Sequence, residues 1–399
     1  MAEQIASKIH LNGKLKNFKK IWEMFIESSD RIKVSQKKVI AKWKLIPPEI
    51  IYALEAVPYD LLLHEGLTRN IERNRETHRY AIEAGLSADF CPWNLSVTNK
   101  ILSEKKSTSV TSFLGASGVC DASLKSLEIM SEQTRKPLHA IEIPTYNIQS
   151  EKNAILFLEE ELKHLFEVFS ESKEYDYFEE YILFEVKIGN RIRKIIQEIT
   201  HLLSHKHPPM SSLEYFIIHA TMGDYLQNPN LLEKILIEIK EEAKERIKDK
   251  NIMNSNMNDA SRIYYIGEPP QNLRFWNLIE ECGGVLVGCD TYLPLFYETI
   301  PETNSILKVL AKWIWENPYH MPIPDRAESL SKHIKRQNPD CVMIGNSVGC
   351  RKLASSDKII KEIIKEKLKI PVTSIEFSSS NDDISLLEPH IKAFIEISK

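Results

Sequence analysis

Short apolar segments that alternate with helical segments dominate the last part of the sequence, and this alternation most constrains the fold. Four segments have the length and composition of buried strands: RIYYIG, GGVLVGCD, DCVMIGN and IPVTSIEF. Helical periodicity lies between or after them, at residues 272–282, 303–316 and 355–367. Strands connected through helices run parallel in one sheet. Residues 256–399 are therefore predicted to form a β/α domain.

A similar alternation occurs near the beginning of the chain. Helices are expected near Pro47, after Cys91 and after Cys120. Short apolar segments at 59–64, 109–114 and 138–144 are expected to be strands. The sequence thus predicts a first β/α domain at residues 36–150, preceded by a helical leader at residues 1–35.

Residues 151–255 have a different pattern, because long charged segments with a helical period follow one another without strands. Examples are NAILFLEEELKHLFEVFS and NLLEKILIEIKEEAKERI, in which Glu and Lys pair at helical spacing. The polar run NIMNSNMNDA at residues 251–260 indicates a boundary at the end of this segment. The predicted fold class is α/β, with two β/α domains whose parallel sheets are Rossmann- or flavodoxin-like, joined by a helical segment.

The charge and hydropathy of the chain exclude several classes of partner. The formal net charge of the 399 residues is -4, which gives no strong attraction to nucleic acid or to an anionic membrane. No apolar run approaches the roughly 20 residues of a membrane helix, and the first residues lack the apolar core of a signal peptide. A cytoplasmic protein is therefore expected, and its six cysteines are not expected to form a disulfide framework.

Several motifs of catalytic sites are absent, and one short motif is present. The chain has no GxxxxGK[ST] loop, so it is not expected to hydrolyse ATP itself, and it has no CxxC pair. The sequence GNSVG fits a nucleophile elbow, with Ser347 followed by Asp382 or Asp383 and then His390. Because small residues are common wherever a strand turns into a helix, a plain turn at Ser347 is the alternative interpretation.

Three cysteines share a placement that suggests metal binding. Cys91, Cys120 and Cys350 each stand in a loop before a predicted helix, in DFCPWNL, SGVCDAS and SVGCRKLAS. Functional loops of parallel sheets gather at the carboxyl ends of the strands, and helix N-termini favour thiolates. Three thiolates from separate loops would suit a cluster with one open coordination position. At each position a buried filler residue is the alternative.

Around these cysteines the sequence resembles the 2-hydroxyacyl-CoA dehydratase family, which also contains the subunits of ATP-dependent benzoyl-CoA reductases. The resemblance covers most of the chain and depends on the order and spacing of its segments. These segments are IPPEIIYALEAVPYDLLLHEG, CPWNL, GVCDASLKSLEIMSEQTRKPLHAIEIP, GNRIRK, IYYIGEPPQNLRFWNLIEECGGVLVGCD, IGNSVGCRKLAS and IPVTSIEF.

The resemblance implies a cofactor, a reaction and several partners. It implies a [4Fe–4S] cluster held by Cys91, Cys120 and Cys350, with the fourth iron position open. It also implies a homologous second subunit in a heterodimer, an acyl-CoA substrate and a separate ATP-dependent iron–sulfur activator that delivers one electron. In the dehydratases of the family this electron forms a ketyl radical from which water is lost. In the reductases it enters an aromatic ring.

Three further residues are candidates for roles in such a site. Glu65, which follows YDLLLH, and Glu49 are candidates for acid–base catalysis. Arg351, next to Cys350, is a candidate for binding a phosphate or for stabilising the negative charge of a cluster. The alternatives are surface carboxylates and an exposed ion pair.

The chain also departs from the pattern of the family that it resembles. Glu268 stands where relatives with a double-cubane cluster need a further cysteine, so a double cubane is not expected. Trp43, Lys44, Phe377 and His390 replace residue types that are frequent in the family. Because of these differences, a non-catalytic subunit that relays electrons or stabilises its partner is a further alternative, beside the dehydratase and the benzoyl-CoA reductase-type subunit.

Overall fold

The structure is a computed structural model. It describes residues 14–43, 46–67, 78–103, 109–146, 150–169, 175–249, 259–296, 298–377 and 384–399. Lys44, Asp382 and Asp383 lie outside the described residues. Within these ranges no helix is both long and apolar enough to cross a membrane.

The first sheet is built from the amino-terminal part of the chain. Its four strands are all parallel, in the order β2-β1-β3-β4. The strands are β1 (Val39–Lys42), β2 (Val57–Asp60), β3 (Ser112–Ser117) and β4 (Leu138–Glu142). The helices of this part are α3 (Pro48–Ala53), the π-helix η1 (Leu62–Leu67), α4 (Arg79–Glu83), α5 (Pro92–Ser103) and α6 (Asp121–Thr134).

The second sheet is built from the carboxyl-terminal part of the chain. Its four strands are also parallel, in the order β6-β5-β7-β8. The strands are β5 (Ser261–Ile266), β6 (Gly284–Cys289), β7 (Cys341–Ser347) and β8 (Val372–Phe377). The helices of this part are α12 (Arg274–Glu281), η5 (Leu293–Leu295), α13 (Ile306–Trp315), α14 (Ile323–Gln337), η6 (Ala354–Ser356), α15 (Asp357–Leu368), η7 (Ile384–Leu387) and α16 (Glu388–Ser398).

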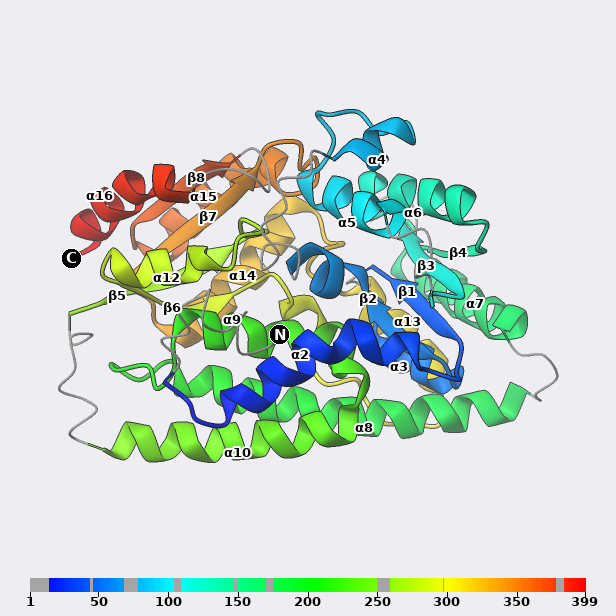
Figure 1. The fold of residues 1–399 in the computed structure, drawn as a ribbon. Helices are drawn as coiled ribbons and strands as arrows, with labels where there is room; N and C mark the ends of the chain where they lie inside the picture. The colour runs from blue at the N-terminus through cyan, green and yellow to red at the C-terminus, as the bar shows by residue number, and fades with distance from the viewer. Residues whose placement is uncertain are drawn as a thin grey trace.

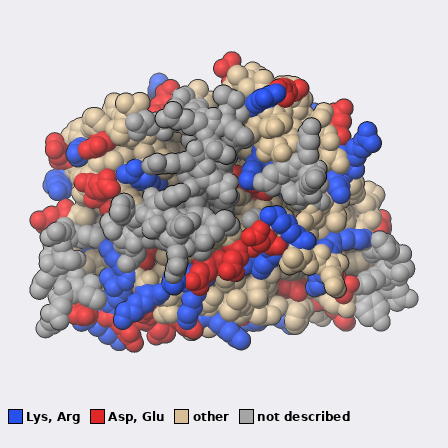
Figure 2. Space-filling model, viewed as in Figure 1, with Lys and Arg blue, Asp and Glu red and all other residues tan. Residues whose placement is uncertain are grey.

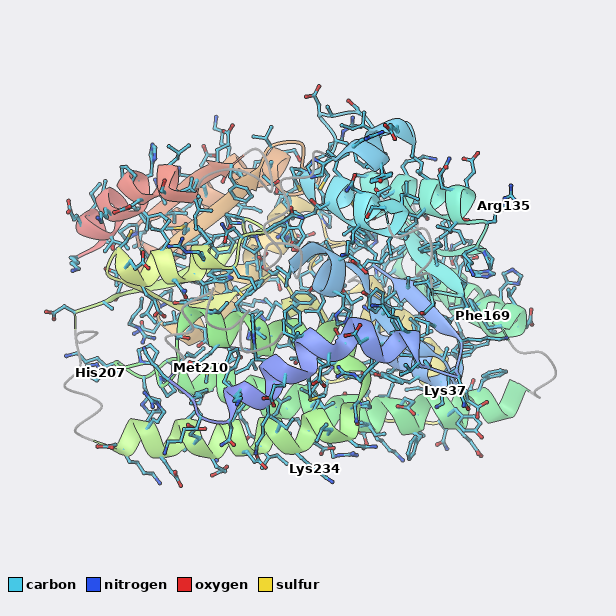
Figure 3. All side chains as sticks on the ribbon, viewed as in Figure 1. Lys37, Arg135, Phe169, His207, Met210 and Lys234 are labelled. Carbon is cyan, nitrogen blue, oxygen red and sulfur yellow. The ribbon has the colours of Figure 1, made fainter. Side chains whose placement is uncertain are left out.

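A layer of helices connects the two sheets. The long helices α8 (Tyr175–Leu202) and α10 (Pro229–Lys248) run side by side beneath both sheets in Figure 1, and α2 (Phe18–Lys33) lies above them. The remaining helices of this layer are α7 (Glu151–Phe169), α9 (Ser212–Ala220), η3 (Thr221–Gly223) and η4 (Tyr225–Gln227). The apolar faces of α8 and α10 are buried, whereas their charged faces are exposed, as Lys234 shows in Figure 3.

The two sheets have the same topology, although their sequences show no repeat. In each sheet the first strand lies between the second and the third, so the strand order reverses beside the first strand. Ligands of open parallel sheets bind at the carboxyl ends of the strands at this point. The predicted fold class, α/β with two parallel sheets, is confirmed.

The hydrophobic core is continuous across the segments that the sequence pattern separates. The helix α13, which belongs to the carboxyl-terminal part of the chain, packs against α7 and shares a buried cluster with Ile40 of β1 and Leu114 of β3. This cluster places α13 over the first sheet, as Figure 1 also shows. The predicted boundaries of the four segments stay a prediction.

Charged side chains of both signs are visible among the described residues on the face shown in Figure 2. Basic and acidic side chains alternate along its lower rim, where α10 and α8 lie. Many are Glu–Lys or Glu–Arg pairs within or between these helices, such as Arg191 with Glu233 at 2.7 Å. Exposed pairs of this kind contribute little to stability, so the layer is stabilised mainly by its apolar faces.

Candidate metal centre

Two of the candidate cysteines occupy equivalent positions in the two sheets. Cys120 follows β3 by three residues, in Ser117-Gly-Val-Cys, and Cys350 follows β7 by three residues, in Ser347-Val-Gly-Cys. Both strands are the third of their sheet and lie beside the strand at which the order reverses. The two loops therefore leave their sheets at the edge where parallel sheets bind ligands.

Cys91 comes to the same place through a contact between two loops. Gly349 has a φ of +86°, and a Cβ on it would lie 3.0 Å from the carbonyl oxygen of Asp89 and 3.1 Å from that of Phe90. The loop of Cys350 thus packs directly on the backbone that precedes Cys91. Only glycine combines this φ with so close an approach of two backbones.

The three cysteines line one pocket. Cys91 is 9% exposed, and Cys120 and Cys350 are half-buried. The other residues of its described lining are Trp43, Leu62, Trp93, Asn94, Val119, Glu268, Tyr319, Ser347, Lys352 and Leu353. The cavity measures about 50 Å³, whereas ligand pockets start at roughly 300 Å³. It has room for a compact group but not for an acyl-CoA.

The donor set of the pocket fits a polynuclear centre better than a single metal ion. Within the described residues, no three His, Cys, Asp or Glu side chains are placed to hold one metal ion together. Three thiols distributed around one pocket instead suit an iron–sulfur cluster, in which each thiolate binds a different iron. Thiolates are also the ligands that iron–sulfur clusters prefer.

The surroundings of Cys91 disfavour its thiolate form. Burial raises the pKa of Cys91 to about 12, and the charges of Cys350 and Cys120 act in the same direction. The backbone N–H groups of Asn94 and Trp93, at the start of α5, act in the opposite direction. A metal centre bound by Cys91 would reverse this balance, because its positive charge would favour the thiolate.

The described lining of the pocket contains one cationic side chain, that of Lys352, which was not among the residues predicted from the sequence. The described lining contains Lys352 but not its neighbour Arg351, which is exposed. Burial lowers the pKa of Lys352, while the charges of Cys120 and Asp121 act in the opposite direction. Residues 351–353 form a turn between Cys350 and the helix η6. Within this turn Lys352 lines the pocket, whereas Arg351 is exposed.

Comparison with known families agrees with this geometry. Residues 45–397 match the sequence model of the 2-hydroxyglutaryl-CoA dehydratase D-component family. The chain belongs to this family. The matched part of this D-component chain contains the three pocket cysteines and every strand except β1. No curated protein matches the sequence.

Glu65 lies beside the pocket, in the π-helix η1 of this D-component chain. Its carboxylate is buried and accepts a hydrogen bond from the hydroxyl of Tyr59 at 2.6 Å. It is not part of the described lining, but Leu62 of the same helix is. Short π-helical turns occur often at functional sites, because they change the direction of a side chain.

Glu49 lies away from the pocket, in an ion pair between α3 and α8. Its Oε1 is 2.5 Å from Nη1 of Arg193 and accepts a hydrogen bond from the hydroxyl of Tyr225 at 2.5 Å. Both charged side chains are completely buried. A Cβ on Gly189 would come within 1.9 Å of the same oxygen, so the two helices meet closely here. The contacts of Glu49 are those of a structural residue.

The arrangement that a nucleophile elbow needs is not assembled among the described residues. Ser347 is buried and lines the pocket, but its hydroxyl has no hydrogen-bond partner in the described part of the chain. His390 lies exposed on α16. Ser347 is instead the last residue of β7, three residues before Cys350.

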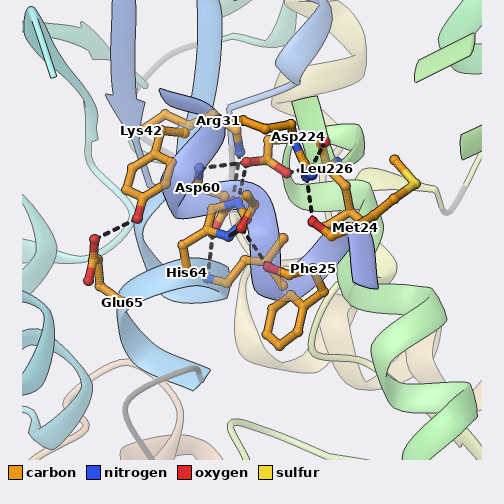
Figure 4. A network of polar contacts seen from close by, with 12 residues as sticks. Met24, Phe25, Arg31, Lys42, Asp60, His64, Glu65, Asp224 and Leu226 are labelled. Carbon is orange, nitrogen blue, oxygen red and sulfur yellow. Dashed lines mark hydrogen bonds and ion pairs between the residues drawn. The ribbon is translucent and has the colours of Figure 1, made fainter. Parts of the chain in front are cut away.

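A buried polar network includes chain neighbours of two lining residues, because Lys42 precedes Trp43 and His64 lies in the same π-helix as Leu62. No sequence motif reveals this network. Asp60 accepts a hydrogen bond from the ammonium of Lys42 at 2.9 Å, and its backbone N–H donates to Asp224. His64 lies between Asp224 and Ser28, at 2.6 Å from each (Figure 4). The network joins the ends of β1 and β2, the π-helix η1, η4 and α2. Its members come from separate segments, so only the fold brings them together.

Proposed function

We propose that this chain is the iron–sulfur subunit of a 2-hydroxyacyl-CoA dehydratase, which removes water from a 2-hydroxyacyl-CoA through a ketyl radical. One observation carries the proposal: in a chain of the D-component family, cysteines from three separate loops, two of which follow equivalent strands of the two parallel sheets, line one pocket. The family description favours a dehydratase over a benzoyl-CoA reductase.

Each part of the pocket has a role in this proposal. Cys91, Cys120 and Cys350 would hold a [4Fe–4S] cluster, which supplies one-electron transfer and Lewis acidity when bound. Trp43 and Trp93 of the lining are buried and would shield a cluster from water on their side of the pocket.

The proposed reaction balances without a net change in electrons. One electron enters the thioester carbonyl and forms a ketyl radical anion, which expels hydroxide from the α-carbon. Loss of a proton from the β-carbon and return of the electron leave a 2-enoyl-CoA and water. The electron is needed because the β-hydrogen of a 2-hydroxyacyl-CoA is not activated for ordinary elimination. Glu65 is the candidate for the proton transfer, because it lies one helical turn from the pocket wall.

The proposal includes two protein partners. A D-component is by its description one component of a larger enzyme. We propose a homologous second subunit that forms a heterodimer with this chain in the cytoplasm. The electron would come from a separate ATP-dependent iron–sulfur activator.

The test is dehydration by the assembled enzyme under strict exclusion of oxygen. The chain is purified with its second subunit and incubated with activator, ATP, a low-potential reductant and 2-hydroxyglutaryl-CoA. We expect a 2-enoyl-CoA, detected by mass spectrometry, with wild type and with Cys282→Ser but not with Cys120→Ser. Reduction of benzoyl-CoA in place of dehydration would contradict the proposal. Equal turnover by the second subunit alone would make this chain a non-catalytic partner.

A further inference from the structure

We propose that Lys352 is the counter-charge of the cysteine pocket and raises the reduction potential of the cluster held there. This inference rests on the proposed function, because it concerns the cluster that the three cysteines would bind. It concerns a residue that touches no reacting atom in the structure and acts through the electrostatics of the pocket.

The lining of the pocket contains few charged side chains. Lys352 is its only Lys or Arg among the described lining residues, and Glu268 is its only carboxylate. Glu268 accepts a hydrogen bond from the hydroxyl of Tyr319 at 3.2 Å. With ionised thiols, the pocket would carry several negative charges and a single positive charge.

Lys352 also has no ion-pair partner among the described residues, although the charge of Asp121 acts on it from a distance. Its ammonium is half-buried and makes no hydrogen bond or ion pair with any described residue. Arg326, whose positive charge also acts on Lys352, is itself paired with Asp290 at 2.6 Å and lies over the ring of Tyr319. Partial burial removes part of the hydration of the Lys352 ammonium, and no ion pair replaces it. An anionic centre in the pocket would supply this partner.

The positive charge of Lys352 would favour reduction of a cluster in the pocket. Reduction adds one negative charge to a cluster, and a neighbouring cation stabilises the reduced form more than the oxidised form. This effect is large where water is excluded and small where a charge is exposed. Lys352 lies in the pocket wall, whereas Arg351 is exposed one residue away. The two side chains therefore form a matched pair with equal charge and different burial.

The experiment compares K352M, K352R and R351M with wild type after anaerobic purification. Iron and sulfide are measured first, and the cluster is then titrated with Ti(III) citrate and redox mediators while its reduced form is followed by electron paramagnetic resonance. We expect K352M to disfavour reduction at least tenfold, which is about 59 mV for one electron. We expect K352R and R351M to stay close to wild type.

The outcomes separate this inference from the proposed function. A cluster in wild type and K352M with equal potentials would overturn the inference alone, as would an equal shift in R351M. Wild-type protein without iron would overturn both. If K352M binds no iron, the iron content of K352R distinguishes the two explanations. Iron in K352R would support a requirement for the positive charge, and K352R without iron would overturn the role of the charge.

Discussion

Replacing Glu49 by glutamine should weaken the fold strongly and leave the cysteine pocket intact. The substitution removes the negative charge that faces Arg193, which is completely buried between α3 and α8. Arg193 keeps its hydrogen bond to the carbonyl oxygen of Leu295 at 2.8 Å and its position over the ring of Trp313. Neither of these contacts neutralises the guanidinium, so the variant leaves an unpaired charge in the core.

The size of the effect follows from the cost of an unpaired buried charge. Removing one partner of a buried ion pair costs about 3–5 kcal/mol. Glutamine can still accept the hydrogen bond of Tyr225, so we expect about 3 kcal/mol, at the lower end. The double variant Glu49→Gln/Arg193→Met removes both charges and should recover most of this loss, because replacing a whole pair by apolar groups is often close to neutral.

The assay is urea-induced unfolding of both variants and wild type, followed by tryptophan fluorescence, with the iron content measured before unfolding. We expect a lower midpoint for Glu49→Gln, a midpoint near wild type for the double variant, and equal iron in all folded samples. If Glu49→Gln unfolded like wild type but lost turnover, Glu49 would act in catalysis and the structural interpretation would be refuted.

Three further predictions follow from particular contacts. Burial raises the pKa of Glu185 to about 7 from the usual 4.5. Between these two pH values the folded state holds a proton that the unfolded state loses, so the stability of the fold falls as the pH rises through this window. Glu185→Gln should therefore raise the melting temperature more at pH 8 than at pH 5. Lys42→Met leaves Asp60 buried without its partner and should lower the free energy of unfolding by about 3–5 kcal/mol, and an unchanged urea midpoint would refute this. Gly349→Ala should lower the iron content more than Gly85→Ala does, because both glycines have a positive φ but only Gly349 has a backbone within 4 Å of its missing side chain; equal iron in the two variants would contradict the packing argument.

Much of the fold could be predicted because apolar runs and helical periods are local signals. The strands β5, β6, β7 and β8 lie within or next to the predicted segments. The missed elements include β1, whose Val39–Lys42 is too short to show a pattern, and the helices α14 and α16. The polar sequence of α14 hides its narrow apolar face. The strand expected at 59–64 was displaced, because it ends at Asp60 and a π-helix follows.

The candidate site could be predicted only as far as it depends on loops that follow strands. The position of Cys120 and Cys350 after equivalent strands is visible in the sequence, once the strands are known. The choice between Arg351 and Lys352 depends on a turn whose backbone a pattern cannot specify. The burial of Glu49 depends on Arg193, which lies 144 residues away in the chain. Contacts of this kind follow from the fold and not from local sequence.

The most direct test of the account is the iron and acid-labile sulfide content of the anaerobically purified chain. Wild type, Cys120→Ser and Cys282→Ser are compared, because Cys282 is a half-buried cysteine outside the pocket lining. The account predicts about four iron and four sulfide per chain in wild type and in Cys282→Ser, and a large loss in Cys120→Ser. Wild-type protein without iron, or iron that does not depend on Cys120, would contradict it.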